Sequence, residues 1–179
     1  IKKTLKYLKG KPLTIRTLDV GNDKKVPSIE KYLTKSPNPA LGLRAIRLTL
    51  AFPKIFKKQI SAILKASIYG DVRIMLPMVS NVSELIETKK IIKEVKNQIV
   101  IKNKSLKIRM PKIGVLIETP AAALISEALA KNCDFFAIGT NDLTMYTLAI
   151  DRGDEEVAKI YDPGHLSVLK LIQMSTKAA

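Results

Sequence analysis

Several features that would restrict the function of this chain are scarce or absent in its 179 residues. Cysteine occurs once, at Cys133, so no disulfide can form within the chain, as expected in a reducing compartment. Charged residues interrupt every apolar run before the ~18 residues that a membrane span needs. The chain begins IKKTLKYLKGK, without the apolar segment of a signal peptide. We therefore expect a cytoplasmic protein that is not inserted in a membrane.

Arginine is also scarce, although the chain is strongly basic. Lysines make up 25 of the 31 basic residues, and the formal net charge is +15. The lysines are spread along the chain, which favours a solvated lysine-rich surface over a nucleic-acid site. Because a lysine ammonium does not replace the planar arginine fork at a carboxylate or phosphate, the few arginines mark positions of interest. Half of the six, Arg16, Arg44 and Arg152, lie in the motifs described below.

No expected strand is followed by a glycine-rich phosphate loop, which argues against an open nucleotide-binding sheet. The chain shows instead a regular alternation of apolar strands and helical patterns, with a long loop expected over 24–40. Such alternation predicts parallel strands in an α/β fold. We expect a partial (β/α)8 TIM barrel with about four of its eight strands, because a whole barrel usually needs ~250 residues. The expected strands are 13–17, 72–76, 113–117 and 135–138, and the expected helices are 1–9, 42–51, 53–68, 82–99, 120–130 and 168–174.

Charged and amide side chains follow the strands at the points where the strands end. In parallel α/β folds these ends build the functional site. Glu118 and Asp142 are 24 residues apart, one strand–helix–strand unit, and should lie over neighbouring strands ~5 Å apart. Two such carboxylates repel each other, and Mg²⁺ would remove the conflict. On spacing alone the alternative is equally open: each carboxylate caps the helix that follows it.

The three arginines favour the metal site. Arg16, Arg44 and Arg152 could converge on one anion near the same strand ends, although each could instead form an ordinary surface salt bridge. Together with the carboxylate pair they indicate a site for a phosphorylated carboxylate with Mg²⁺, in which the Asn141 amide donates to a phosphate oxygen.

The stretches that carry these residues resemble the phosphoenolpyruvate-protein phosphotransferase family, enzyme I of the bacterial sugar phosphotransferase system. Pyruvate phosphate dikinase and phosphoenolpyruvate synthase share the barrel and the GTNDL-type segment, and they are the enzymatic alternative. A non-enzymatic basic interaction module that binds nucleic acid is the second alternative. The resemblance covers essentially the whole chain and rests on IRTLDVGNDK (15–24), NPALGLRAIR (38–47), SAILKAS (61–67), RIMLPM (73–78), IGVLIETPAAA (113–123) and FFAIGTNDLTMYTLAIDRG (135–153).

The resemblance implies that residues 1–179 are part of a C-terminal phosphoenolpyruvate-binding TIM-barrel domain that forms a homodimer in the intact protein. By motif position it assigns Mg²⁺ to Glu118 and Asp142. It assigns phosphoenolpyruvate to Arg16, Arg44, Asn141, Asp142 and Arg152, and it places Lys24 in the substrate loop.

It also implies that the N-terminal phosphohistidine and carrier-binding domains, which pass the phosphoryl group to the phosphocarrier protein in sugar uptake, are absent. The cysteine that protonates the enolate would likewise lie outside this chain, so we expect no turnover from the chain alone. His165, in a surface turn, and Cys133, a packed small residue at the opposite end of its strand from the site, match neither catalytic group.

Overall fold

The computed structural model of the protein describes residues 1–21, 32, 36–151 and 153–179. Its centre is a four-stranded sheet in which every neighbouring pair is parallel. The strands are β1 (Leu13–Arg16), β2 (Val72–Leu76), β3 (Lys112–Ile117) and β4 (Phe135–Ile138), in the spatial order β1-β2-β3-β4. Because chain order and spatial order agree, the sheet lacks the reversal of a doubly wound fold. The predicted α/β class and the four predicted strands are confirmed.

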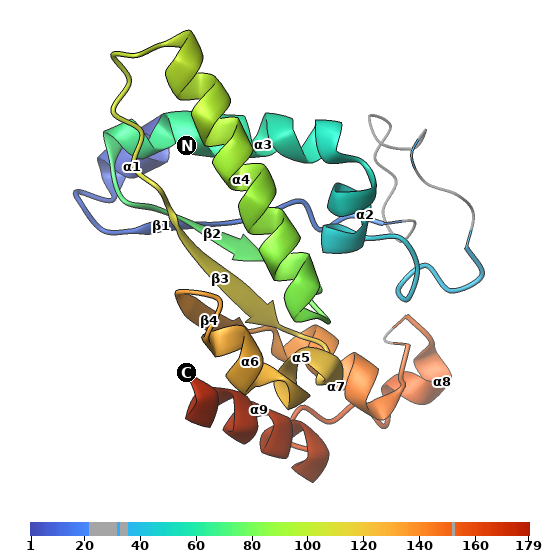
Figure 1. Ribbon diagram of the computed structural model, residues 1–179. Coiled ribbons are helices and arrows are strands. Elements are labelled where there is room, and N and C mark those ends of the chain that lie inside the picture. The colour runs from blue at the N-terminus through green and yellow to red at the C-terminus, as the bar shows by residue number, and fades with distance from the viewer. Residues whose placement is uncertain (22–31, 33–35, 152) are drawn as a thin grey trace.

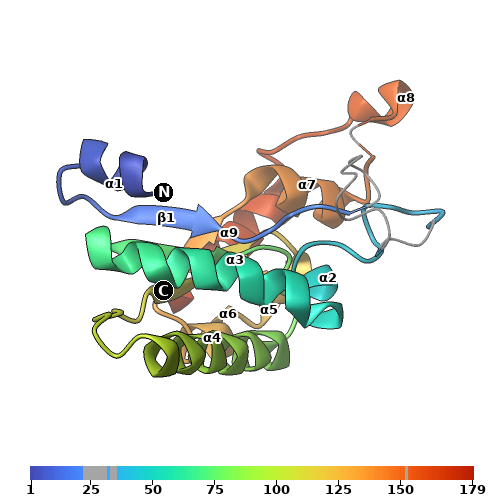
Figure 2. The ribbon, with the colours of Figure 1, turned by 90° about the horizontal axis from the view of Figure 1, so that it is seen from above.

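Helices precede, connect and follow the strands (Figure 1). Contacts run from α3 to α4, from α4 to α6 and from α6 to α9, so these four helices form a continuous layer. Figure 2 shows α3 and α4 side by side in this layer. The helices are α1 (Lys2–Tyr7), α2 (Ala45–Ala51), α3 (Pro53–Ala66), the 3-10 turn η2 (Ser67–Tyr69), α4 (Val82–Lys102), α5 (Pro120–Leu124), α6 (Ser126–Ala130), α7 (Thr140–Leu148), α8 (Glu155–Ala158) and α9 (Leu166–Ala178).

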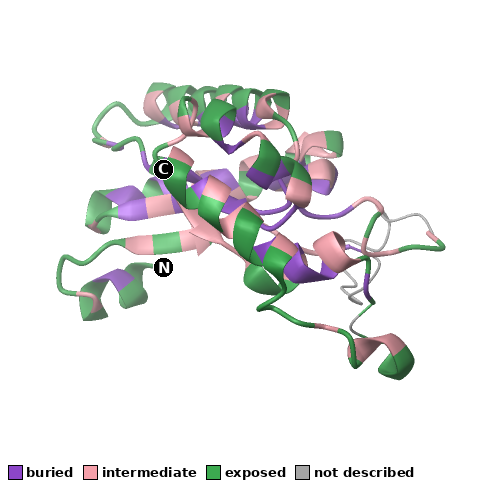
Figure 3. Ribbon diagram, turned by 90° about the horizontal axis from the view of Figure 1, so that it is seen from below, coloured by how far each residue is buried: buried purple, intermediate pink, exposed green. Residues whose placement is uncertain are grey.

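The strand register separates a core face of the sheet from a second face. Ile74 pairs with Ile113, and both are buried in the core that the strands share with the helices. Figure 3 shows the buried parts of the ribbon in purple. Successive side chains of a strand point to opposite faces of the sheet, so Met75 and Gly114, which follow Ile74 and Ile113, lie on the second face. A single register line, Arg16–Met75–Gly114–Phe135, crosses all four strands there. Gly114 is required in this line, because a Cβ at that position would lie 2.3 Å from the Phe135 ring.

Local sequence signals explain where two of the connecting helices begin. Asn81 caps α4: its side chain accepts from the Ser83 N–H at 3.0 Å, while Glu84 accepts from the Asn81 N–H at 3.0 Å. Thr119 caps α5 by accepting from the Ala122 N–H at 3.1 Å, and a proline occupies the first helical position.

Some predicted boundaries are wrong. The predicted helix 120–130 is divided into α5 and α6, because Ile125 leaves helical geometry at φ −102° and ψ 19°. Helix α2 begins at Ala45 rather than at 42, since Arg44 is extended and Ala45 has a φ of +50°. The prediction missed α7 and α8, and it ended α4 and α9 too early.

Most of the predicted loop 24–40 lies outside the described residues. In the described part of the chain, no helix combines the length and the apolar character needed to cross a membrane.

Candidate functional site

A hollow of about 770 Å³ lies at the carboxyl end of the sheet. Its lining comes from β1 and the segment after it, from the segment before α2, from the ends of β2, β3 and β4, and from α7 and the segment after it. The lining residues are Arg16, Asp19, Ala40, Arg44, Met75, Leu116, Glu118, Ile138, Gly139, Thr140, Asn141, Asp142, Met145, Asp151 and Gly153.

Glu118 is the most buried carboxylate of the hollow, with 2 % of its surface exposed. It follows β3 directly, and its Oε1 accepts from the Met78 backbone N–H at 2.6 Å. Met78 is buried and has a left-handed φ of +57°, an unusual conformation for this residue type. Burial raises the pKa of Glu118 from 4.5 to about 7; the Met78 hydrogen bond lowers it, and the negative charges of Asp142 and Asp19 raise it further.

Gly139 leaves the space that the Glu118 side chain occupies. The Gly139 N–H continues the β3–β4 ladder by donating to Ile117 O at 2.9 Å. A Cβ at Gly139 would lie 2.9 Å from both Cβ and Oε2 of Glu118, closer than real contacts allow. The same glycine is the N-cap of α7, which carries Asp142 in its first turn. Glu118 and Asp142 therefore follow neighbouring strands, as the sequence predicts.

The alternative in which the two carboxylates cap helices is wrong. Helix α5 is capped by Thr119, and α7 has no side-chain cap hydrogen bond. The stretch after β4 is also not the predicted turn and loop, because helix α7 begins at Thr140. Asp142 thus projects from a helix whose partial positive N-terminus favours a carboxylate.

Arg44, the N-cap of α2, also lines the hollow and is 4 % exposed. Its NH2 donates to Asp19 Oδ1 at 2.9 Å and lies 3.6 Å from Asp142 Oδ2. Its NH1 donates to the Tyr146 hydroxyl at 3.3 Å, and that hydroxyl donates to the backbone oxygen of Ala40 at 2.6 Å. Burial raises the pKa of Tyr146, and the charge of Arg44 opposes this shift. The alternative of a surface salt bridge is therefore wrong for Arg44.

Arg16 and Asp19 complete the charged lining near β1. Arg16 NH1 lies 3.4 Å from Asp19 Oδ2, and the Arg16 side chain is 46 % exposed, so this ion pair is partly solvated. Asp19 is 5 % exposed and also accepts from Arg44. The sequence analysis missed Asp19 as a site residue, although its position three residues after Arg16 in the RTLD stretch is a signal that could have found it.

Asn141, Lys24 and Arg152 are the remaining residues that the sequence predicts for the site. Asn141 is exposed at the hollow, where the Tyr161 hydroxyl donates to its Oδ1 at 3.4 Å. Lys24 and Arg152 lie outside the described residues. Asp151 and Gly153, the two neighbours of Arg152 in the chain, both line the hollow.

The donor set at the hollow suits a hard divalent cation. In the described residues no three acidic, histidine or cysteine side chains form a metal-binding group. Mg²⁺ commonly needs fewer, because it takes one or two carboxylates and completes its shell with water and substrate phosphate oxygens. Glu118 and Asp142 could supply these two carboxylates, and a cation there would oppose both the burial, which contributes most to the raised pKa of Glu118, and the smaller repulsion by Asp142.

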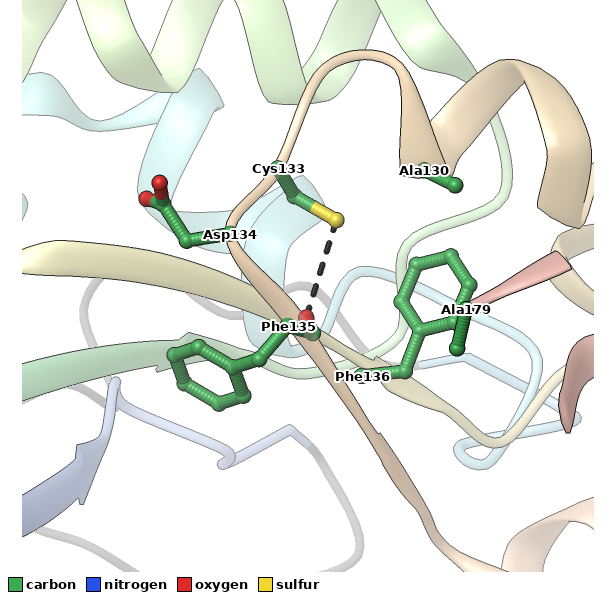
Figure 4. Close-up of a pocket in the computed structure, with 6 residues that line it drawn as sticks. All are labelled: Ala130, Cys133, Asp134, Phe135, Phe136 and Ala179. Carbon is green, nitrogen blue, oxygen red and sulfur yellow. Dashed lines mark hydrogen bonds between the residues drawn. The ribbon is translucent and has the colours of Figure 1, made fainter.

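Cys133 and His165 lie away from the hollow. A smaller hollow of about 60 Å³ lies beside Cys133, before β4 and thus at the other end of the sheet (Figure 4). The Cys133 thiol donates to Phe135 O at 3.6 Å, and burial raises the pKa of this thiol, which disfavours the reactive thiolate. His165 is exposed and caps α9, where its Nδ1 accepts from the Ser167 N–H at 3.3 Å.

The chain belongs to the family described as PEP-utilising enzyme, PEP-binding domain, where PEP is phosphoenolpyruvate; the match covers residues 1–179. Curated relatives carry the name phosphoenolpyruvate-protein phosphotransferase, as the resemblance predicted. Those of Staphylococcus epidermidis and Bacillus subtilis are each 42 % identical to the chain, and each match covers 99 % of the chain and 31 % of the relative. That of Buchnera aphidicola is 46 % identical over 93 % of the chain and 28 % of the relative. The chain therefore spans about a third of the length of these enzymes.

Proposed function

We propose that the chain is the phosphoenolpyruvate- and Mg²⁺-binding part of a phosphotransferase, built as part of a (β/α)8 barrel. The observation that carries the proposal is the meeting of two carboxylates, Glu118 and Asp142, with Arg16 and Arg44 in one hollow. The strand order β1-β2-β3-β4 and the continuous helix layer support the barrel, since a barrel is wound in one direction.

In this proposal Glu118 and Asp142 hold Mg²⁺, which when bound neutralises charge on the phosphoryl group. Arg16, Arg44 and Arg152 bind the carboxylate and phosphate oxygens of the ligand, because a guanidinium fork can donate two parallel hydrogen bonds to either group. Asn141 donates its amide N–H to a phosphate oxygen, and Lys24 lies in a substrate loop. The chain's residues thereby orient the substrate and stabilise its negative charge, which are the main requirements of phosphoryl transfer.

The wider reaction follows from the names of the relatives. Their phosphotransferase name supports transfer from phosphoenolpyruvate to a protein, over the dikinase and synthase alternative. We propose that the phosphoryl group passes to an enzyme histidine and then to the phosphocarrier protein for sugar uptake, in a cytoplasmic homodimer. The histidine and the proton donor for the enolate are placed outside residues 1–179, so the chain alone binds the substrate without turnover.

Calorimetric titration of the chain with phosphoenolpyruvate, with Mg²⁺ and with EDTA, tests the proposal. We expect binding that needs Mg²⁺ and is lost in Glu118→Gln and Asp142→Asn. Asp71→Asn is the matched control, because Asp71 is an exposed partner of Arg73 at the other end of the sheet. Binding unchanged in both site variants would refute the assignment. Salt-dependent DNA binding without phosphoenolpyruvate binding would favour the basic interaction module instead.

A further inference from the structure

The carboxylate of Asp19 lies between two arginines that come from different parts of the chain. Its Oδ1 accepts from Arg44 NH2 at 2.9 Å, and its Oδ2 lies 3.4 Å from Arg16 NH1. Asp19 and Arg44 each have side chains that are only 5 % exposed. One buried carboxylate thus contacts the guanidinium groups of residues 16 and 44.

The backbone around Asp19 is fixed on both sides. Before it, the Thr17 N–H donates to Met75 O at 3.0 Å, and the Leu18 N–H donates to the Gln59 side chain at 3.0 Å. After it, Val20 O accepts from the Ala45 N–H at 3.2 Å, directly beside Arg44. These bonds fix the position of Asp19 between β1 and α2. A side chain that orients other side chains must itself be held in place in this way.

An arginine has five N–H donors, so one guanidinium group can contact Asp19 and a further acceptor at the same time. The position of Arg44 also matters for Asp142, because its NH2 lies 3.6 Å from Asp142 Oδ2. The same nitrogen therefore contacts Asp19 closely and Asp142 less closely. A cation bound to Asp142 and the Arg44 guanidinium would compete for that carboxylate.

We propose that Asp19 is a positioning residue for the site: it orients Arg16 and Arg44 toward one anion and keeps Arg44 from pairing fully with Asp142. This limits the competition between the Arg44 guanidinium and a divalent cation for the Asp142 carboxylate. This inference rests on the proposed function, in which Asp142 binds the metal and the arginines bind the phosphorylated ligand.

The test measures Mn²⁺ affinity of the chain by electron paramagnetic resonance, with no other ligand present, in a double-mutant cycle. In Asp19→Asn, we expect Arg44 to turn to Asp142 and the Mn²⁺ affinity to fall by about tenfold, a change of about 1.4 kcal/mol. In the Arg44→Met background, the same Asp19 substitution should change Mn²⁺ affinity little, because the competing guanidinium is gone. Phosphoenolpyruvate affinity at saturating Mn²⁺ should fall in every one of these variants.

The cycle separates positioning from simple loss of charge. If Asp19 acted only through its negative charge, its substitution would weaken Mn²⁺ binding by the same factor in both backgrounds. Equal factors, or no effect of Asp19→Asn in either background, would overturn the inference. Asp71→Asn, which removes an exposed carboxylate partner of an arginine, should leave both affinities unchanged.

A folding control and one further variant distinguish a failed inference from a failed proposed function. Circular dichroism establishes that each variant folds; should Asp19→Asn not fold, Asp19→Glu replaces it. Asp19→Glu keeps the charge but moves it by one methylene, so positioning predicts weaker phosphoenolpyruvate binding and unchanged binding would refute it. If the unsubstituted chain binds neither Mn²⁺ nor phosphoenolpyruvate, the proposed function fails and this inference fails with it. If the unsubstituted chain binds both and the cycle is additive, only the inference fails.

Discussion

Replacing Glu118 by glutamine should make the protein more stable at high pH and should remove a pH dependence that the native residue causes. The Glu118 carboxyl is 2 % exposed, and burial raises its pKa from 4.5 to about 7. Glutamine has nearly the same shape and its side-chain oxygen can accept the Met78 hydrogen bond, but it never becomes charged. The substitution therefore isolates the free energy of burying the charge.

The sign and size of the effect follow from proton linkage. Below pH 4.5 Glu118 is protonated in both the folded and the unfolded chain, and above about pH 7 it is ionised in both. Between these values the folded chain binds more protons, so the free energy of unfolding falls as the pH rises. The difference between 4.5 and about 7 corresponds to roughly 3 kcal/mol of lost stability.

Urea denaturation at pH 4 and pH 8, with EDTA present, measures this pH-dependent change in the free energy of unfolding. From pH 4 to pH 8 the native chain should lose roughly 3 kcal/mol relative to Glu118→Gln. Glu94→Gln is the control, because Glu94 forms an exposed ion pair with Lys57 at 2.8 Å, and such pairs contribute ~0–1 kcal/mol. A difference between the native chain and Glu118→Gln that stays constant over this pH range would refute the reasoning. If Glu118 binds Mg²⁺ as proposed, saturating Mg²⁺ at pH 8 should restore much of the lost stability of the native chain and not that of Glu118→Gln, because a ligand that binds only the folded state stabilises it.

Three smaller predictions concern packing and hydrogen bonds. Gly114→Ala should destabilise the chain by about 1–3 kcal/mol in urea denaturation, because its methyl group would overlap the Phe135 ring, and Phe135→Leu should recover part of this loss. Asn81→Ala should cost about 1 kcal/mol in the same assay, since it removes half of the α4 capping box. Tyr146→Phe should cost roughly 1 kcal/mol by removing the 2.6 Å hydrogen bond to Ala40, and calorimetry should show weaker phosphoenolpyruvate binding. A variant whose free energy of unfolding equals that of the native chain would contradict the prediction made for it.

The strands could be predicted from the sequence because they are apolar runs with clear ends. β2 and β4 match the predicted ranges, and β3 begins one residue earlier, at Lys112. Parallel pairing followed from the alternation with helices, and it placed Glu118 and Asp142 over neighbouring strands. The part of the site that depends only on strand ends was thus within reach of sequence reasoning.

Helix α7 was not predicted, because its first turn has the composition of a turn. Thr140, Asn141 and Asp142 favour turns and helix starts alike, and propensity alone does not separate the two. The helix is stabilised by tertiary packing: Leu143 and Met145 are buried, and α7 contacts α5 and α9. Composition could not reveal this, since the contacts join segments that lie far apart in the chain.

Asp19 shows why pairs of charges are harder to predict than strand ends. Its contact with Arg16 is local, three residues along the chain, and could have been proposed from RTLD. Its shorter contact with Arg44 depends on the Ala45–Val20 hydrogen bond and on the left-handed φ of Ala45, which turn the start of α2 toward β1. No periodicity encodes a single backbone turn of this kind. The charge of a site can therefore be estimated from sequence, whereas the pairing of its charges, here Asp19 with both Arg16 and Arg44, requires the fold.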